Sequence, residues 1–365
     1  EEFLILLRIP SVSTDEAHQK DIQRAANFLA QKLTRIGFEK VEVIPTARHP
    51  IVYGEKMVDP KSPTILIYGH YDVQPPDPIN SWESPPFDPQ VKGNYLFARG
   101  ASDMKGQIWA TISAIQSILE TTELPVNIKY LIEGEEEIGS PNLEGFLDTH
   151  QTMLACDIVL NPDAGMLAPD KPTIIYALRG LAYFELRVYG PKADLHSGIF
   201  GGVVANPANV LSKIIAEMHD DQGKVTLPGF YEQVRQITDE ESEEMSKIGT
   251  NEAFFKTVTG VPALGGEVGF SPIERVGARP TLDVNGFYSG YIDQGAKTII
   301  PAYAMAKIST RLVPDQDPEI IHESLKAFLQ EKVPDTVTWE LDYLSGAPAY
   351  IAEEQAPGVS LFADA

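Results

Sequence analysis

Ionisable side chains follow three apolar segments of the sequence. The segments are 63–69 (PTILIYG), 126–134 (VNIKYLIEG) and 157–162 (DIVLNP), and the side chains after them are His70 and Asp72, then Glu135, Glu136 and Glu137, then Asp163. Continuous apolar runs of this length are typical of buried parallel strands. Because the carboxyl ends of parallel strands meet at one edge of a sheet, we expect these side chains to lie there. Asp103, directly before a predicted helix at 104–120, is expected at the same edge.

One imidazole and at least five carboxylates at a single edge would repel one another unless a cation neutralised them, so the pattern predicts a metal site. A histidine with several carboxylates and no thiolate suits Zn²⁺ or Mn²⁺ better than a structural zinc site built from cysteines. The number of carboxylates exceeds what one ion needs and indicates two ions, roughly 3.5–4 Å apart and bridged by an aspartate. Asp72 is expected to hold the other nitrogen of His70 and fix its tautomer.

Each of these residues also has a simpler explanation. His70 alone could be structural, and EGEEEIGS alone reads as a solvated acidic loop. Asp103 could only cap the helix that begins near Met104, and Asp163 could be a turn residue in NPDAG. Their common position at strand ends is what favours the metal site.

The elements expected around this edge predict two domains, at 1–177 and 178–365. In the first, helices at 21–38, 104–120 and 140–150 alternate with the strands, which predicts an α/β fold with a mostly parallel sheet flanked by helices. The second has alternating, strand-like segments and two helices, which predicts an α+β domain with helices on one sheet face. Its strands are expected at 180–190, 303–313 and 336–344, its helices at 206–220 and 317–332, and long loops with short helices at 221–280.

Composition excludes several classes of function. The formal net charge of −23 disfavours binding to nucleic acid and to anionic membranes, and a soluble acidic surface explains it. No run of 18 apolar residues is present, and the opening EEFLILLRIPSVS is expected to be helical rather than a signal peptide. With Cys156 as its single cysteine the chain cannot form an intrachain disulfide, which fits a cytoplasmic location.

Four motifs in this order, GHYDVQP, GASDMKGQ, EGEEEIGS and NPDAG, resemble those of the co-catalytic zinc peptidases and amidohydrolases. That family includes carnosinase-like dipeptidases, glutamate carboxypeptidases, succinyl-diaminopimelate desuccinylase, acetylornithine deacetylase and aminoacylase-1. The segment WESPPFDPQVKGNYLFARGASDMKGQ is most similar to the carnosinase-like dipeptidase branch. The resemblance implies a catalytic domain with an inserted lid, or dimerisation, domain.

The resemblance also implies roles for the residues at the sheet edge. The implied ligands are His70 and Asp163 for the first zinc ion, Asp103 as the bridge, and Glu137 for the second ion. Glu136 is implied as the general base, although the run of three glutamates makes this depend on the alignment with EEIGS. Asp72 matches the aspartate that orients the histidine. The metal implied is Zn²⁺, with Mn²⁺ or Co²⁺ as alternatives.

Three residues of the second domain match functional positions of the family, of which His196 is implied to be catalytic, by polarising the scissile carbonyl, and the other two to bind substrate. His196, in DLHSG, resembles a histidine that enters the active site of the partner subunit, which implies a homodimer through the lid. Arg311 resembles the arginine that binds the substrate carboxylate, and Thr298 is a further expected contact. A turn residue at 196 and a surface ion pair at 311 are the simpler alternatives.

The sequence departs from the family in one respect. The family has a further zinc-binding histidine near its C-terminus, whereas the last histidine here is His322, in a predicted helix of the lid and expected to face solvent. We therefore expect the rest of the lid and the C-terminal part of the catalytic domain to be absent.

The expected activity is hydrolysis of a peptide bond in dipeptides or short peptides with a free C-terminal carboxylate, by a metal-activated water with a glutamate base. An N-acyl amino acid deacylase or desuccinylase is the alternative within enzymes, because the site is shared and only the lid pocket differs. A metal-binding homologue without catalysis is the alternative from another class.

Overall fold

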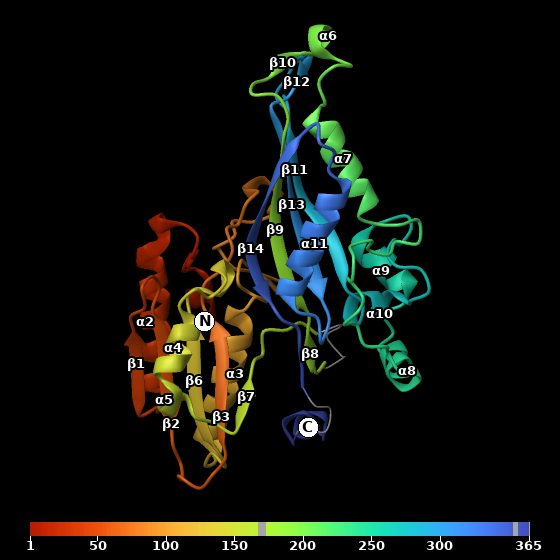
Figure 1. Cartoon of the computed structure of the whole chain (residues 1–365). Coiled ribbons are helices and arrows are strands. Elements are labelled where there is room, and N and C mark those ends of the chain that lie inside the picture. Colours follow the sequence, from red (N-terminus) through yellow and green to blue (C-terminus); the bar gives the residue numbers. More distant parts are fainter. Residues whose placement is uncertain (167–172, 353–356, 365) are drawn as a thin grey trace. The chain divides into compact units, whose positions relative to one another are not determined.

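The computed structural model describes residues 1–166, 173–352 and 357–364, which form two compact units (Figure 1). The first unit spans Glu1–Thr173 and the second spans Ile174–Ala365. Within the described residues, no helix has both the length and the apolar character needed to cross a membrane. Each unit has its own hydrophobic core and is described by itself below.

A five-stranded sheet in the order β1-β2-β6-β3-β7 forms the centre of the first unit. Its strands are β1 (Lys40–Ile44), β2 (Ile51–Lys56), β3 (Thr64–His70), β6 (Asn127–Glu133) and β7 (Ile158–Leu160). Strand β3 pairs in parallel with both β6 and β7, whereas β1 and β2 join the sheet in antiparallel orientation. The three strands whose ends carry the predicted site are therefore adjacent and parallel, with β3 in the middle.

Helices cover both faces of this sheet, as the continuous apolar strands predict. On one face, α1 (Glu2–Leu7), α2 (Gln19–Arg35) and α3 (Lys105–Thr121) bury side chains against the strands. On the other face, α4 (Leu143–Thr149) and α5 (Gln151–Leu154) do the same. Figure 1 shows these layers around β3 and β6.

Strand β3 ends unusually close to α3. A Cβ atom on Gly69 would lie 2.8 Å from a side-chain carbon of Ile108 and 3.0 Å from the methyl carbon of Met104. Only glycine lets the helix approach the strand end this closely. This packing holds the start of α3, and Asp103 just before it, against the carboxyl end of β3. The connection between β3 and α3 carries a small hairpin of β4 (Gln90–Lys92) and β5 (Tyr95–Phe97).

The second unit is built on a four-stranded antiparallel sheet in the order β11-β13-β9-β14. Its strands are β11 (Thr281–Ser289), β13 (Tyr303–Leu312), β9 (Gly180–Tyr189) and β14 (Thr338–Ala347). Helices α7 (Pro207–Glu217) and α11 (Pro318–Lys332) pack on one face, and every second residue of β9 is buried against them. The opposite face carries polar side chains, in agreement with the α+β expectation.

The remaining elements of the second unit lie around this sheet. The segment 221–280 contains three short helices, α8 (Asp239–Lys247), α9 (Glu252–Thr259) and α10 (Pro272–Gly277). A two-stranded ribbon of β10 (Leu195–His196) and β12 (Ile299–Ile300), with the single turn α6 (Ser197–Phe200), lies at one end of the sheet (Figure 1). Strands β8 (Ala177–Leu178) and β15 (Tyr350–Ile351) form another short pair, and α12 spans Pro357–Asp364.

Candidate metal centre

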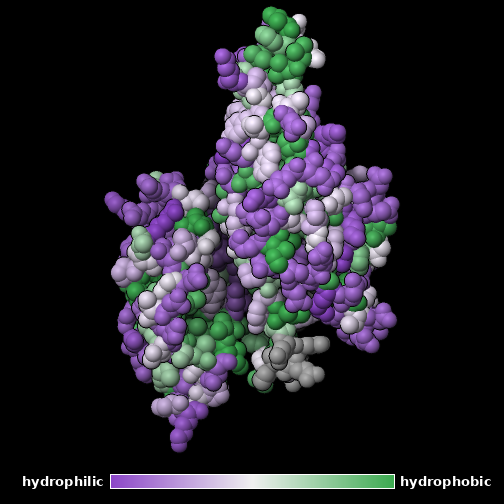
Figure 2. All heavy atoms as spheres, viewed as in Figure 1, coloured by the Kyte–Doolittle hydropathy of each residue, from purple (hydrophilic) through white to green (hydrophobic). Residues whose placement is uncertain are grey.

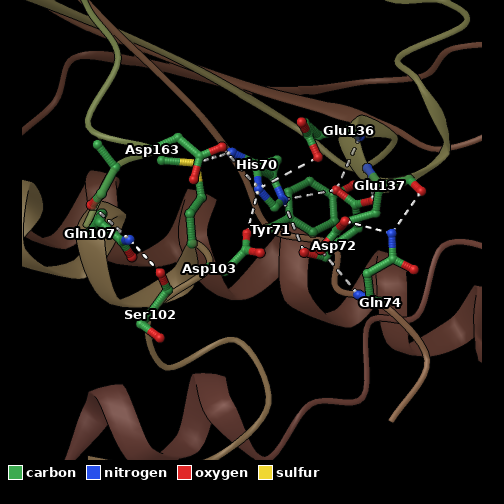
Figure 3. A network of polar contacts seen from close by, with 12 residues as sticks. His70, Tyr71, Asp72, Gln74, Ser102, Asp103, Gln107, Glu136, Glu137 and Asp163 are labelled. Atoms are coloured by element: carbon green, nitrogen blue, oxygen red, sulfur yellow. Dashed lines mark hydrogen bonds and ion pairs between the residues drawn. The ribbon is translucent and has the colours of Figure 1, made fainter. Parts of the chain in front are cut away.

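The predicted site residues of the first unit converge at the carboxyl ends of β6, β3 and β7 (Figure 3). His70 is the last residue of β3, the middle strand, and pairs with Glu133 at the end of β6. The turn with Glu136 and Glu137 follows β6, and the loop with Asp163 follows β7. The order of the strands thus places His70 between two groups of carboxylates.

The orientation of His70 leaves one ring nitrogen available for a ligand. The side chain is fully buried, and its Nδ1 lies 3.0 Å from the backbone carbonyl oxygen of Asp72. A carbonyl oxygen only accepts hydrogen bonds, so Nδ1 carries a proton and donates it. The other nitrogen, Nε2, is buried and has no hydrogen-bond partner among the described residues. Metal-binding histidines have this arrangement.

Carboxylates surround the free nitrogen of His70 at the spacing of metal ligands. Nε2 lies 3.3 Å from an oxygen of Asp103, 3.5 Å from an oxygen of Asp163 and 3.9 Å from an oxygen of Glu136. Ligand atoms around a tetrahedral zinc ion with bonds of roughly 2.0–2.1 Å are separated by about 3.3–3.5 Å. The first two distances match that spacing, so these residues fit a divalent cation.

The charges at the site favour a cation beside His70. Burial alone would lower the pKa of His70, but the carboxylates of Asp103, Asp163 and Asp72 outweigh this effect and raise that pKa to about 12. Burial, with repulsion from neighbouring acids such as Glu137, raises the pKa of Glu136 to about 7. Burial also raises the pKa of Glu137. A metal ion at Nε2 would replace the proton that this negative field otherwise holds.

Glu137 belongs to the same group of possible ligands. One ligand atom from each of His70, Asp103 and Glu137 lies within 4.8 Å of the other two. Glu137 is in the short turn Glu136–Ile138, and its carboxylate accepts a hydrogen bond of 2.7 Å from the side-chain amide of Gln74. The four metal ligands expected from the sequence, including Asp163, therefore lie at one place in the first unit.

Asp72 contacts both groups of ligands. Its carboxylate is fully buried and accepts hydrogen bonds from the backbone N–H groups of Glu136 (3.3 Å) and Glu137 (3.1 Å). The same carboxylate lies 3.4 Å from Nδ1 of His70, slightly farther than the backbone carbonyl of Asp72. Asp72 therefore holds the turn after β6 as well as the imidazole, and only the second of these contacts was expected from the sequence.

The first glutamate of the acidic run points away from the site. Glu135 is buried, and its carboxylate accepts hydrogen bonds from Thr46, the backbone N–H of His49 and the side chain of Asn142. These bonds, of 2.6–2.9 Å, tie the loop before β2 to the turn after β6. Glu136 and Glu137 are the two acids of the run that remain near the ligands.

The three expected substrate contacts all lie in the second unit, in two separate places. His196 is exposed at the end of β10, where its Nδ1 accepts a hydrogen bond from the N–H of Gly198. The carbonyl of Thr298 accepts a hydrogen bond from the N–H of Ser197, so His196 and Thr298 are neighbours. Arg311 is exposed near the other end of the sheet, on β13 opposite Leu181 and Thr281. Arg311 forms no ion pair within the described part of the chain.

Other residues at the site were not identified from the sequence. Gln74 contacts Glu137, and Gln107 donates from its side-chain amide to the carbonyl oxygens of Ser102 (2.5 Å) and Ala164 (3.4 Å). Both glutamines lie inside the motifs that contain the ligands, and this position is the signal that could have indicated them. His322, by contrast, is half-buried and stacks on Tyr343 rather than facing solvent.

The family model of peptidase family M20/M25/M40 matches residues 66–365. The chain belongs to this family. The expected class of enzyme, a metallopeptidase, and the resemblance to carnosinase-like dipeptidases are thereby confirmed.

Among curated M20 relatives, a Cys-Gly metallodipeptidase of Schizosaccharomyces pombe is 34% identical over 337 residues, which cover 87% of this chain and 70% of that protein. A Beta-Ala-His dipeptidase of Mus musculus is 31% identical over 284 residues, which cover 77% of this chain and 58% of that protein. Both are peptidases that act on dipeptides, according to their names.

Solved structures show the same fold. An M20 family metallo-carboxypeptidase from Sulfolobus solfataricus superposes with a TM-score of 0.84 at 36% identity, covering 98% of this chain and 80% of that one. Human carnosine dipeptidase 1 superposes with a TM-score of 0.83 at 27% identity, covering 96% and 78%. These matches confirm the predicted fold class, an α/β domain with a flanked sheet together with a second α+β domain.

Proposed function

We propose that this M20 family member hydrolyses the peptide bond of dipeptides or short peptides with a free C-terminal carboxylate, using two divalent metal ions. The observation that carries the proposal is the free, buried Nε2 of His70, which lies 3.3 and 3.5 Å from carboxylates of Asp103 and Asp163. The dipeptidase and carboxypeptidase relatives support the substrate class.

The residues present divide between the two ions. His70 and Asp163 would hold one ion, Glu137 the other, and Asp103 would bridge them. Bound ions would acidify a shared water and polarise the substrate carbonyl. One imidazole with several carboxylates suits Zn²⁺, and Mn²⁺ or Co²⁺ accept the same ligands.

Glu136 is proposed as the general base. Its carboxylate lies 3.9 Å from Nε2 of His70, next to the ligand group but farther away than the nearest carboxylates of Asp103 and Asp163. A carboxylate beside the ions that is not itself a ligand can accept a proton from water and return it to the leaving amine. The hydrogen bond from its backbone N–H to Asp72 fixes the position of the turn.

The separation of His196 and Arg311 supports a site completed by a second subunit. Strand β13 spans roughly 26 Å from Tyr303 to Arg311 at 3.3 Å per residue. His196 pairs with Ile299 in the ribbon beyond the Tyr303 end, so His196 and Arg311 lie near opposite ends of the sheet (Figure 1). A dipeptide extends over only about 7 Å. His196 and Arg311 of one subunit therefore cannot both contact the same dipeptide. We propose that Arg311 binds the substrate carboxylate, while His196, with Thr298, serves the partner subunit.

The surface of the second unit supports a homodimer. Apolar residues gather over α6 and the ribbon of β10 and β12 (Figure 2). Ile199, in α6, and Val203, just after it, are 69% and 84% exposed. Exposed apolar clusters of this kind mark interaction surfaces. A cytoplasmic location is part of the same proposal, because the single Cys156 is a free thiol.

The test of the base is Glu136→Gln. Activity on dipeptides is expected to fall by about 10²–10⁴-fold, because the amide cannot accept the proton, while the metal content stays the same. Hydrolysis at the wild-type rate would refute the assignment of Glu136. Assays with the wild-type protein should compare dipeptides with N-acyl amino acids at equal metal loading. Faster cleavage of N-acyl amino acids would replace the dipeptidase proposal with a deacylase.

A further inference from the structure

Gln74 makes three contacts with a single residue of the metal centre. Its side-chain Nε2 donates to Oε2 of Glu137 (2.7 Å) and to the backbone carbonyl of Glu137 (3.3 Å), and its backbone N–H donates to Oε1 of Glu137 (3.2 Å) (Figure 3). Both carboxylate oxygens of Glu137 are thus held by one glutamine. Each oxygen can accept two hydrogen bonds, so lone pairs remain for a cation.

The loop that directly follows His70 therefore also fixes the turn that carries Glu137. The carboxylate of Asp72, two residues after His70, accepts hydrogen bonds from the backbone N–H groups of Glu136 and Glu137. Gln74, two residues farther along, holds the side chain of Glu137. Backbone and side chain of this turn are both attached to the loop after β3, which supplies the first histidine ligand.

We propose that Gln74 is the positioning residue for Glu137, and that it sets the affinity of the ion that Glu137 binds. The inference rests on the proposed metal site. A glutamate side chain loses rotamer entropy when it binds an ion, and a hydrogen bond that already holds the carboxylate reduces this loss. Hydrogen-bond partners of ligating carboxylates typically change metal affinity by about 10–100-fold when removed.

A second glutamine of the same unit shows what an ordinary surface contact looks like. Gln90, in the β4–β5 hairpin, donates from Nε2 to the carboxylate of Asp88 (3.0 Å) and to the carbonyl of Asp88 (3.3 Å). The pair has the same chemistry as Gln74 with Glu137. The difference is that Glu137 lies within 4.8 Å of ligand atoms of His70 and Asp103, and Asp88 is not part of that group. Gln90 is therefore a matched control.

The experiment compares Gln74→Met and Gln74→Glu with Gln90→Met in the whole protein. Metal-free samples are titrated with Zn²⁺ by calorimetry, and Co²⁺-loaded samples are examined by absorption spectroscopy. For Gln74→Met we expect one of two ions to bind about 10–100-fold more weakly while the other is unchanged. The Co²⁺ bands of the affected ion should shift. Gln74→Glu also lacks the side-chain N–H groups, so the Co²⁺ bands of the same ion should shift in this variant as well.

The outcomes separate this inference from the proposed function. A wild-type protein that binds no divalent ion overturns the metal site itself. If the wild-type protein binds two ions and Gln74→Met binds them with the same affinities and spectra as the wild type, the role of Gln74 is refuted but the metal site is not. Equal losses in Gln74→Met and Gln90→Met also refute it, because a general effect of removing a surface amide would explain them. Gln74 is exposed, and unfolding temperatures of the metal-free variants close to wild type will show that the fold is retained.

Discussion

The two units treat the charged side chains of their sheets in opposite ways. On the open face of the second unit, Arg187 pairs with Asp342 (2.7 Å) and Lys307 pairs with Glu185 (3.1 Å). At the sheet edge of the first unit, five acids lie near one imidazole, namely Asp72, Asp103, Glu136, Glu137 and Asp163. Within the described residues, no lysine or arginine forms an ion pair with these acids. Charges on the open face of the second unit neutralise one another, whereas the acids at the sheet edge of the first unit have no such partners.

In a strongly acidic chain, unpaired acids that converge at one place indicate a functional site better than the total charge does. A net charge of −23 by itself indicates only an acidic surface. Paired charges across neighbouring strands stabilise a sheet by modest amounts, so the open face of the second unit has a structural explanation. Unpaired acids that converge on a buried imidazole are unfavourable without a cation, and they persist where binding a cation offsets that cost.

The largest effect is expected at the unpaired acids. Asp103→Asn removes the proposed bridge between the ions, and metal binding should weaken by more than about 100-fold, beyond the loss seen when only a partner of a ligand is removed. Hydrolysis of dipeptides should fall with the bound metal. Metal analysis after equilibrium dialysis is the measurement, and Asp342→Asn, on the paired face, is the control. Comparable metal loss in both variants would end the contrast between the two surfaces.

Asp72→Asn should have the next largest effect. Asn can accept only through its single oxygen, so one of the two N–H groups of Glu136 and Glu137 loses its partner. We expect metal affinity to fall by about 10–100-fold. Zinc titration by calorimetry checks this value. Unchanged affinity would show that the backbone carbonyl of Asp72 alone is enough to orient His70.

Arg311 is an exception on the open face of the second unit, because it has no ion-pair partner among the described residues. If it binds a substrate carboxylate, Arg311→Ala should raise KM for dipeptides by about 10–100-fold, the range expected for a hydrogen bond to a charged group. Dipeptide amides, which lack that carboxylate, should show no such change. Arg187→Ala, which removes a paired arginine of the same face, should leave KM unchanged for both substrates. A rise in KM for amides as well would assign Arg311 a structural role.

The strands, and the ionisable residues that gather at the sheet edge, were predictable because their signal is local. An apolar run followed by a polar side chain defines a strand end, and His70, Glu137 and Asp163 lie at or just after such ends, whereas Asp103 directly precedes the apolar helix α3. The run of three glutamates could not be resolved in this way. Which acid turns inward depends on Thr46 and on the backbone of His49, and both are distant in the sequence.

Two parts of the fold were not predicted for a related reason. Strands β1 and β2 join the sheet in antiparallel orientation, and with five and six residues they are too short to be recognised as strands in the sequence. Strand β11 is an edge strand on which Leu282 is the only buried residue. Edge strands bury one face incompletely, so their hydrophobic pattern is faint. The contact of Gln74 with Glu137 depends on tertiary structure in the same way.

The smallest effect is expected at a paired charge of the first unit, far along the sequence from the metal centre. The carboxylate of Glu2 forms ion pairs with Lys32 and Arg35, with N···O distances of 2.7 Å in both cases. The hydrogen bond from Lys32 lowers the pKa of Glu2. A carboxylate whose pKa is lower in the folded state stabilises the protein above its unfolded pKa, and this contribution is lost as the pH falls through the folded pKa. Glu2→Gln should therefore reduce the free energy of unfolding at pH 7 and have little effect below about pH 4.

The size of that loss will show whether the unpaired charges of the first unit are confined to its metal centre. Glu2 is partly exposed and solvent screens its pairs, so we expect a loss of about 0.5–1 kcal/mol at pH 7 in urea unfolding. Lys32 is almost fully buried and keeps Gln116 as a hydrogen-bond partner, which limits the cost of losing Glu2. An equal loss at pH 7 and pH 3.5 would mean that Glu2 acts through packing rather than charge. A loss confined to neutral pH would show that the ion pairs of Glu2 stabilise the first unit through charge. Away from His70 the first unit would then pair its charges as the second unit does, and the unpaired acids would be a property of the site.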